Sequence, residues 1–245
     1  MNNMVLTISL GNLALSFLPV LVVILILWRW SLHYRNAIYA VFRMLVQLML
    51  IGYLLTYIFK SDSALIVLIV VAVMIFASSW IALGTAGKQR KKLYLKAMYS
   101  IGIGGGLILI LVTEGVLNLA PWYLPQYMIP LAGMIFANSM NSVSLSAERL
   151  MAEIRTSHNY EQARNTAFNA SLIPNINSLF AVGLVSLPGM MTGQILSGVD
   201  PLIAARYQIM VMCMIFASAG ISTALFLVLI RSDLIDQKLL TMSGL

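Results

Sequence analysis

The 245-residue sequence predicts an all-α, polytopic helical membrane protein with about seven transmembrane helices. First, 60% of its residues are hydrophobic and only 9% are charged, whereas roughly a quarter of the residues in a soluble domain are charged. Second, the mean hydropathy is +0.92. Third, apolar runs long enough to cross a bilayer follow one another with short polar loops between them. We therefore expect a single transmembrane domain over residues 1–245.

Seven apolar runs are the predicted spans, and each has about the length that a membrane crossing needs. They lie at residues 13–28, 37–59, 64–83, 98–117, 128–147, 167–188 and 203–230. Most basic residues follow the odd-numbered spans, and only Lys60 and Arg206 lie toward the opposite side. By the positive-inside rule the N-terminus lies outside and the C-terminus in the cytoplasm. We expect a multi-pass protein of the cell membrane, the inner or plasma membrane of a bacterium.

The first span has no basic residue before it, and Arg29 and Arg35 follow it directly. The second span contains Arg43 and Gln47, whose i,i+4 spacing places them on one helix face. A lone arginine within a span faces the bundle interior or extends its charge to the interface. Two alternatives stay open for Arg43: contact with a substrate, and snorkelling or pairing with a loop carboxylate.

The third span is nearly all apolar, and a basic cluster follows it. Its members are Lys88, Arg90, Lys91, Lys92 and Lys96. The cluster is either a patch that binds anionic lipid or a partner, or an ordinary cytoplasmic loop. The fourth span contains Gly102 and Gly106, a small-xxx-small pair that predicts the close approach of another helix.

Amide side chains mark the inner half of the fifth span. Asn138 and Asn141 are i,i+3 neighbours, and they either bond across helices or line a transport pathway. The longest predicted cytoplasmic segment follows, at residues 148–164. Charged residues at helical spacing predict that the helix continues into water; they are Glu148, Arg149, Glu153 and Arg155.

The sixth span is interrupted by proline and glycine. Pro174 and Pro188 lie in this apolar stretch, and Gly189 and Gly193 follow. Prolines within a span free backbone carbonyls, which need partners in protein or in a wet cavity. The stretch is therefore either a broken helix at a site of binding or movement, or a kinked packing helix followed by an external turn at residues 189–201.

Sequence motifs for catalysis are missing. No P-loop pattern occurs, so the chain does not bind ATP by that route. His33 and His158 are isolated in loops, without metal-ligand spacing. The 16 methionines suit either a soft metal such as Cu(I) or packing. The sequence predicts neither an enzyme nor a nucleic-acid-binding protein, and it assigns no metal ligand.

The run VGLVSLPGMMTGQILSGVDP at residues 182–201 resembles the signature of the FetB-type iron-export permeases, a family that includes plant aluminium-tolerance proteins. Four further runs match in family order over most of the chain: RMLVQLMLIGYLLTYIF, IPLAGMIFANSMNSVSLSAERL, SLIPNINS and ARYQIM. The resemblance implies the permease subunit of an ABC transporter, a homodimer that pairs with two copies of a separate ATP-binding subunit. It implies export of iron or a related metal, with ATP used by the partner and no cofactor bound by this chain.

One segment departs from the family pattern. Residues 151–170 read MAEIRTSHNYEQARNTAFNA, without the Gly-Ala-Thr-like step that resembles the coupling loop of ABC importers. The run Glu161-Gln-Ala163 is what remains of this step in the present sequence. The segment expected to couple to the ATPase therefore comprises Glu148, Arg149, Glu153, Arg155 and Glu161.

Two further sets of residues complete the functional hypothesis. The predicted substrate pathway comprises Arg43, Gln47, Asn138, Asn141, Asn175 and Asn177. The predicted gate at the broken helix comprises Pro174, Pro188, Gly189 and Gly193. The alternatives are a secondary transporter or channel that needs no ATPase, and a membrane scaffold that transports nothing.

Overall fold

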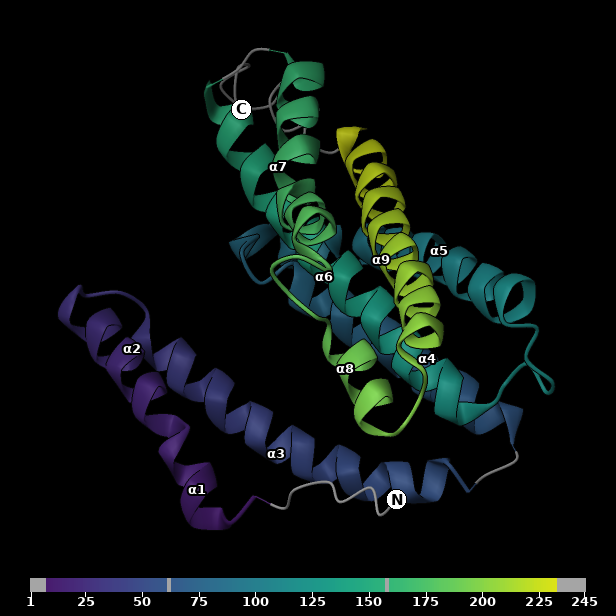
Figure 1. Ribbon diagram of the computed structural model, residues 1–245. Coiled ribbons are helices and arrows are strands. Elements are labelled where there is room, and N and C mark those ends of the chain that lie inside the picture. The colour runs from purple at the N-terminus through teal and green to yellow at the C-terminus, as the bar shows by residue number, and fades with distance from the viewer. Residues whose placement is uncertain (1–7, 61–62, 157–158, 233–245) are drawn as a thin grey trace. The chain divides into compact units, whose positions relative to one another are not determined.

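Figure 1 shows the computed structural model of the chain, in which helices provide nearly all of the regular structure. It describes residues 8–60, 63–156 and 159–232. The chain divides into two compact units, Met1–Ser61 and Asp62–Leu245, and each is described by itself. The all-α prediction is confirmed, while the single transmembrane domain over residues 1–245 stays a prediction.

The first unit consists of α1 (Leu10–Leu15), α2 (Phe17–Arg29) and α3 (Tyr34–Ile58). The hydroxyl of Ser9 caps α1 by accepting a hydrogen bond from the backbone N–H of Asn12 at 3.2 Å. None of the residues in these three helices is buried. Their apolar side chains are therefore free to face lipid, as expected of membrane-spanning helices.

The second unit is a helical bundle in which α6 and α9 pack against each other and against α5 and α7 (Figure 1). Its elements are α4 (Ala64–Ala82), a 3₁₀ turn (Gly87–Gln89), α5 (Arg90–Ile110) continued by a π-helical turn (Leu111–Val116), α6 (Pro125–Thr156), α7 (Tyr160–Ala181), α8 (Gly189–Leu196) and α9 (Pro201–Leu229). Phe136 of α6 and Phe226 of α9 are among its largest fully buried side chains. These helices therefore share one apolar core.

Two glycines of α5 allow neighbouring helices to approach closely. A Cβ atom at Gly104 would lie 2.9 Å from backbone atoms of α9, and one at Gly105 would lie 2.8 Å from an aromatic ring of α6. A Cβ at Gly102 would have its nearest neighbour at 3.5 Å, and one at Gly106 would have none within 4 Å. The prediction that Gly102 and Gly106 form the close contact is therefore wrong.

The basic cluster begins α5 instead of lying wholly in a loop. The guanidinium of Arg90 lies 3.9 Å from the ring centre of Trp80 and donates two hydrogen bonds to the backbone oxygen of the same residue, at 2.6 and 3.1 Å. Arg90 therefore ties the end of α4 to the start of α5. Lys91 and Lys92 are exposed, so both alternatives for the cluster stay open.

Five stretches among the described residues are long and apolar enough to cross a membrane. They are Leu10–Arg29, Tyr34–Ile58, Ala64–Ala82, Arg90–Val116 and Pro201–Leu229, and they match predicted spans one to four and seven. Helices α6 and α7 lie where the fifth and sixth spans are predicted but are not among the stretches that meet this criterion. The polytopic helical membrane fold is confirmed; the number of seven crossings and the orientation stay predictions.

The predicted sixth span is wrong at its outer end. Helix α7 ends at Ala181, residues 182–188 form an irregular connection, and α8 occupies most of the predicted external turn. Gly183 in this connection has a φ of +81°, a backbone conformation that favours glycine. Pro174, by contrast, lies within α7 and does not end it. The helix break is therefore real but lies after Ala181.

Candidate functional site

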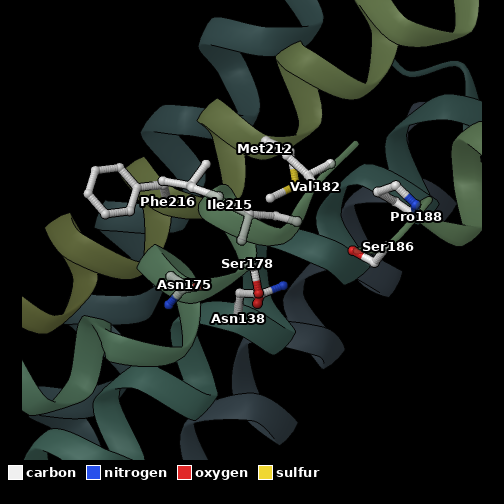
Figure 2. Close-up of a pocket in the computed structure, with 10 residues that line it drawn as sticks. Asn138, Asn175, Ser178, Val182, Ser186, Pro188, Met212, Ile215 and Phe216 are labelled. Carbon is white, nitrogen blue, oxygen red and sulfur yellow. The ribbon is translucent and has the colours of Figure 1, made fainter. Parts of the chain in front are cut away.

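A pocket of about 230 Å³ lies in the second unit, where α6, α7, α9 and the connection at residues 182–188 meet (Figure 2). It is lined by Asn138, Asn175, Ser178, Leu179, Val182, Ser186, Pro188, Met212, Ile215 and Phe216. All ten residues are uncharged. The amides and hydroxyls come from α6, α7 and the connection, whereas α9 contributes apolar side chains and one thioether. The pocket therefore has one polar and one apolar wall.

Helical spacing explains the polar wall. Asn175 and Ser178 are i,i+3 neighbours and share one face of α7 with Ser171, four residues before Asn175. On α6, Asn138 shares a face with Ser142. These two faces meet, because the amide nitrogen Nδ2 of Asn175 donates a hydrogen bond to the Ser142 hydroxyl oxygen at 3.0 Å. Two polar helix faces therefore pack together beside the pocket.

The polar wall presents hydrogen-bond acceptors. Nδ2 of Asn138 donates to the backbone carbonyl one turn earlier in α6, at 2.8 Å. The Ser178 hydroxyl donates likewise within α7, at 2.9 Å, and Nδ2 of Asn175 is bonded to Ser142. These hydrogen bonds leave the Oδ1 atom and one N–H of each asparagine, together with the lone pairs of Ser178. A ligand that offers donors therefore suits this wall.

Buried hydroxyl groups continue the polar character into the bundle. The Ser222 hydroxyl of α9 donates to that of Ser139 on α6 at 3.2 Å, and both residues are fully buried. Thr223 is also fully buried, and its hydroxyl has no hydrogen-bond partner in the protein. Other buried hydroxyls of the unit are those of Ser78, Ser79, Ser100, Thr113, Ser142, Ser146, Ser171 and Ser218. The interior of the second unit is thus unusually rich in small polar side chains.

A second pocket of about 360 Å³ adjoins the first and shares Leu179, Val182 and Met212 with it. Its remaining lining residues are Gly183, Leu187, Met191, Ala205, Gln208, Ile209 and Cys213. The amide oxygen of the buried Gln208 has no partner in the protein. Among the described residues, no three His, Cys, Asp or Glu side chains lie together as candidate metal ligands. The soft-metal alternative for the methionines stays a prediction.

The structure brings two of the six predicted pathway residues together. Asn138 and Asn175 both line the first pocket, and Asn175 is buried. Asn141 and Asn177 are exposed and do not belong to its lining. Arg43 and Gln47 are exposed residues of α3, in the first unit. A pathway role for these four residues stays a prediction.

The predicted gate residues have different environments. Pro188 lines the pocket and directly precedes α8. Gly189 and Gly193 lie within α8, are exposed, and have room for a Cβ atom. Pro174 is exposed on α7. Pro188 is therefore the one member of this set that contacts the pocket.

The predicted coupling segment is the end of α6 and the start of α7. Helix α6 continues to Thr156, which confirms that the helix extends beyond the fifth span. Arg149 and Glu153 form an i,i+4 ion pair at 2.6 Å. Glu148 and Glu161 are exposed. The side chain of Arg155 lies outside the described part of the chain.

Tyr160 connects this segment to α9. Its hydroxyl donates a hydrogen bond to the backbone oxygen of Leu227, and the guanidinium of Arg231 lies 5.9 Å from the centre of its ring. Tyr160 precedes the predicted sixth span, and burial raises the pKa of its hydroxyl, opposed by the positive charges of Arg164 and Arg231. The start of α7 is therefore fixed to the end of α9.

Sequence reasoning missed Ser178, Ser186 and Met212 as pocket residues. The spacing of Ser171, Asn175 and Ser178 along one face of α7 could have identified Ser178. No comparable signal exists for Ser186, because it lies in an irregular connection, or for Met212, whose side chain is one of many methionines in apolar surroundings.

Comparison with known proteins identifies relatives over most of the chain. The family model described as "Uncharacterised protein family (UPF0014)" matches residues 10–235. The "UPF0014 membrane protein slr1647" of Synechocystis is 37% identical over 74% of this chain and 76% of its own length. The "Probable iron export permease protein FetB" of Escherichia coli is 34% identical over 86% of both chains. The "Protein ALUMINUM SENSITIVE 3" of Arabidopsis thaliana is 31% identical over 76% of this chain and 72% of its own length. No solved structure matches the chain.

Proposed function

The chain belongs to the UPF0014 family, and on that premise we propose that it is the permease subunit of an ABC-type transporter that exports iron or a related metal. The observation behind this proposal is the 34% identity, over 86% of both chains, to the probable iron export permease protein FetB of Escherichia coli. In the proposed assembly two copies of this chain pair with two copies of a separate ATP-binding subunit. That subunit hydrolyses ATP, and this chain binds no cofactor and is not an enzyme.

The proposed substrate site is the pocket lined by Asn138 and Asn175. Its walls belong to three different helices and to the connection at residues 182–188, so movement of any of these elements changes its shape. Alternating access requires such a site, because the substrate must be bound while the walls move around it. The irregular connection and the small α8 supply the outer boundary that would open.

The proposed contact with the ATP-binding subunit comprises the end of α6 and the start of α7. Both helices extend past the predicted membrane spans there, and Glu148 and Glu161 are exposed. The hydrogen bond from Tyr160 to Leu227 links the start of α7 to α9, which forms the apolar wall of the pocket. A force applied to the start of α7 would therefore reach both walls of the proposed substrate site.

Co-purification of the chain with a candidate ATP-binding subunit tests the proposal. We expect a stable complex whose ATPase activity in liposomes rises when Fe(II) is present on the cytoplasmic side. The control is the same complex with an ATP-binding subunit that binds but cannot hydrolyse ATP. A chain that moves iron without any ATPase would be a secondary transporter or channel, and one that moves nothing under either condition would be a scaffold.

A further inference from the structure

The first pocket offers a ligand several hydrogen-bond acceptors and no charge. One N–H of each amide, in Asn138 and Asn175, and the hydroxyl hydrogen of Ser178 are bonded within the protein, at 2.8, 3.0 and 2.9 Å. Their oxygen atoms form the polar wall, with the Ser186 hydroxyl at its edge (Figure 2). A ligand that is surrounded by N–H or O–H donors can therefore bind these oxygens.

Neutral oxygens do not replace the water shell of a multivalent cation. Removing water from an ion is very costly, and protein sites that hold bare metal cations compensate with carboxylate, imidazole or thiolate ligands. The ten lining residues provide two amides, two hydroxyls and one thioether. Small divalent cations also dehydrate reluctantly. A cation therefore enters this pocket at the lowest cost when it keeps its water.

The size of the pocket agrees with a hydrated ion. Six water molecules, at about 30 Å³ each, occupy roughly 180 Å³. The pocket has a volume of about 230 Å³. A hexahydrated metal ion is therefore accommodated, with its water molecules donating to the acceptor wall.

We infer that this pocket recognises a divalent metal cation through its intact water shell, by hydrogen bonds to Asn138, Asn175 and Ser178, and not by direct coordination. This inference rests on the proposed function, since it specifies the form in which the transported metal is held. It explains how a permease of metal ions can use a pocket whose lining is uncharged. It also implies weak discrimination between divalent ions of similar hydrated size.

The test uses hexaamminecobalt(III), a complex whose six ammonia ligands do not exchange and which mimics a hydrated metal ion. Binding to the purified full-length chain in lipid nanodiscs is measured by displacement of Mn(II), followed by electron paramagnetic resonance. We expect the cobalt complex to displace Mn(II), and bound Mn(II) to retain six water molecules. If Mn(II) binds but the complex does not displace it, if Mn(II) loses water on binding, or if neither ion binds, the inference is wrong.

Substitutions of pocket residues test whether the cobalt complex binds in the first pocket. Asn138→Leu and Ser178→Ala each remove one acceptor and should weaken binding of the cobalt complex about tenfold, the effect of losing one hydrogen bond to a charged group. The matched controls are Gln126→Leu on α6 and Asn169→Ala on α7, which alter exposed amides outside the pocket and should bind normally. Equal affinity of both pocket variants and both controls would overturn the assignment. Ser178→Ala keeps the test valid if Asn138→Leu does not fold.

The two proposals fail in different experiments. Ion binding is measured on this chain alone, whereas the proposed function depends on a complex with the ATP-binding subunit and on ATP-driven transport. Transport with no displacement by the cobalt complex would refute the hydrated-ion inference only. Displacement without any ATPase complex would refute the proposed partner and leave the pocket assigned.

Discussion

The two units of the chain use apolar side chains in opposite ways. In α2 and α3 of the first unit no residue is buried, although both helices are strongly apolar. In each of the stretches Arg90–Val116 and Pro201–Leu229 of the second unit, 44% of the residues in the most apolar 18-residue segment are buried in the protein. The first unit therefore depends on the bilayer as its solvent, whereas the second unit has a packed core of its own. Substitutions of the same type should have different effects in the two units.

The largest expected difference comes from removing a phenylalanine. Phe136→Ala empties a fully buried site between α5 and α6 and should lower the free energy of unfolding by about 3–5 kcal/mol. Phe42→Ala in α3 removes a side chain that is 64% exposed and should have a much smaller effect. Unfolding of both purified variants in the same detergent measures the difference. Equal destabilisation would show that α3 is buried in the functional assembly.

Two glycine-to-alanine substitutions within α5 should change the stability of the chain in opposite directions. Gly104→Ala places a Cβ atom 2.9 Å from the backbone of α9 and should destabilise the chain by about 1–3 kcal/mol. Gly106→Ala meets no atom within 4 Å and should be neutral or stabilising by up to about 1 kcal/mol, the helix-propensity gain. Thermal unfolding midpoints in lipid nanodiscs compare the two. Stabilisation by both alanines would contradict the close packing of α5 on α9.

The polar contact between α6 and α7 should contribute less. Asn175→Ala removes the hydrogen bond to Ser142 and should lower stability by about 1 kcal/mol. Asn177→Ala, two residues away on the exposed face, should change stability within about 0.5 kcal/mol. If Ser142→Ala and the double variant each lose no more unfolding free energy than Asn175→Ala alone, the two residues are coupled. If the losses of the two single variants add up in the double variant, they are not coupled.

The smallest expected effect is a dependence on alkaline pH. Burial raises the pKa of Tyr160 above its ordinary value of 10.0, so the neutral hydroxyl stabilises the fold below pH 10. This contribution is lost as the pH rises through the raised pKa. Tyr160→Phe removes both the hydrogen bond to Leu227 and this dependence. Stability curves of wild type and variant should converge at alkaline pH; curves that stay parallel would refute the assignment.

The sequence predicted the helical membrane fold because apolar composition and run length report directly on the bilayer. It predicted Asn138 and Asn175 because amides are conspicuous in apolar helices. It misplaced the helix break, since Pro174 is tolerated within α7 and the break occurs at a connection where Gly183 has a positive φ. It chose Gly102 and Gly106 over Gly104 because the small-xxx-small pattern gives a spacing but not the face that meets another helix.

The hydrogen bond between Asn175 and Ser142 also bears on how the protein is made. Unlike the other predicted spans, α6 and α7 are not among the stretches of the described chain that are long and apolar enough to cross a membrane. Their polar faces meet each other, and their ends are separated only by residues 157–159. During synthesis the two helices should therefore enter the membrane together as a hairpin, each shielding the amides and hydroxyls of the other from lipid. Asn175 and Ser142 would thus serve membrane insertion as well as the proposed substrate site.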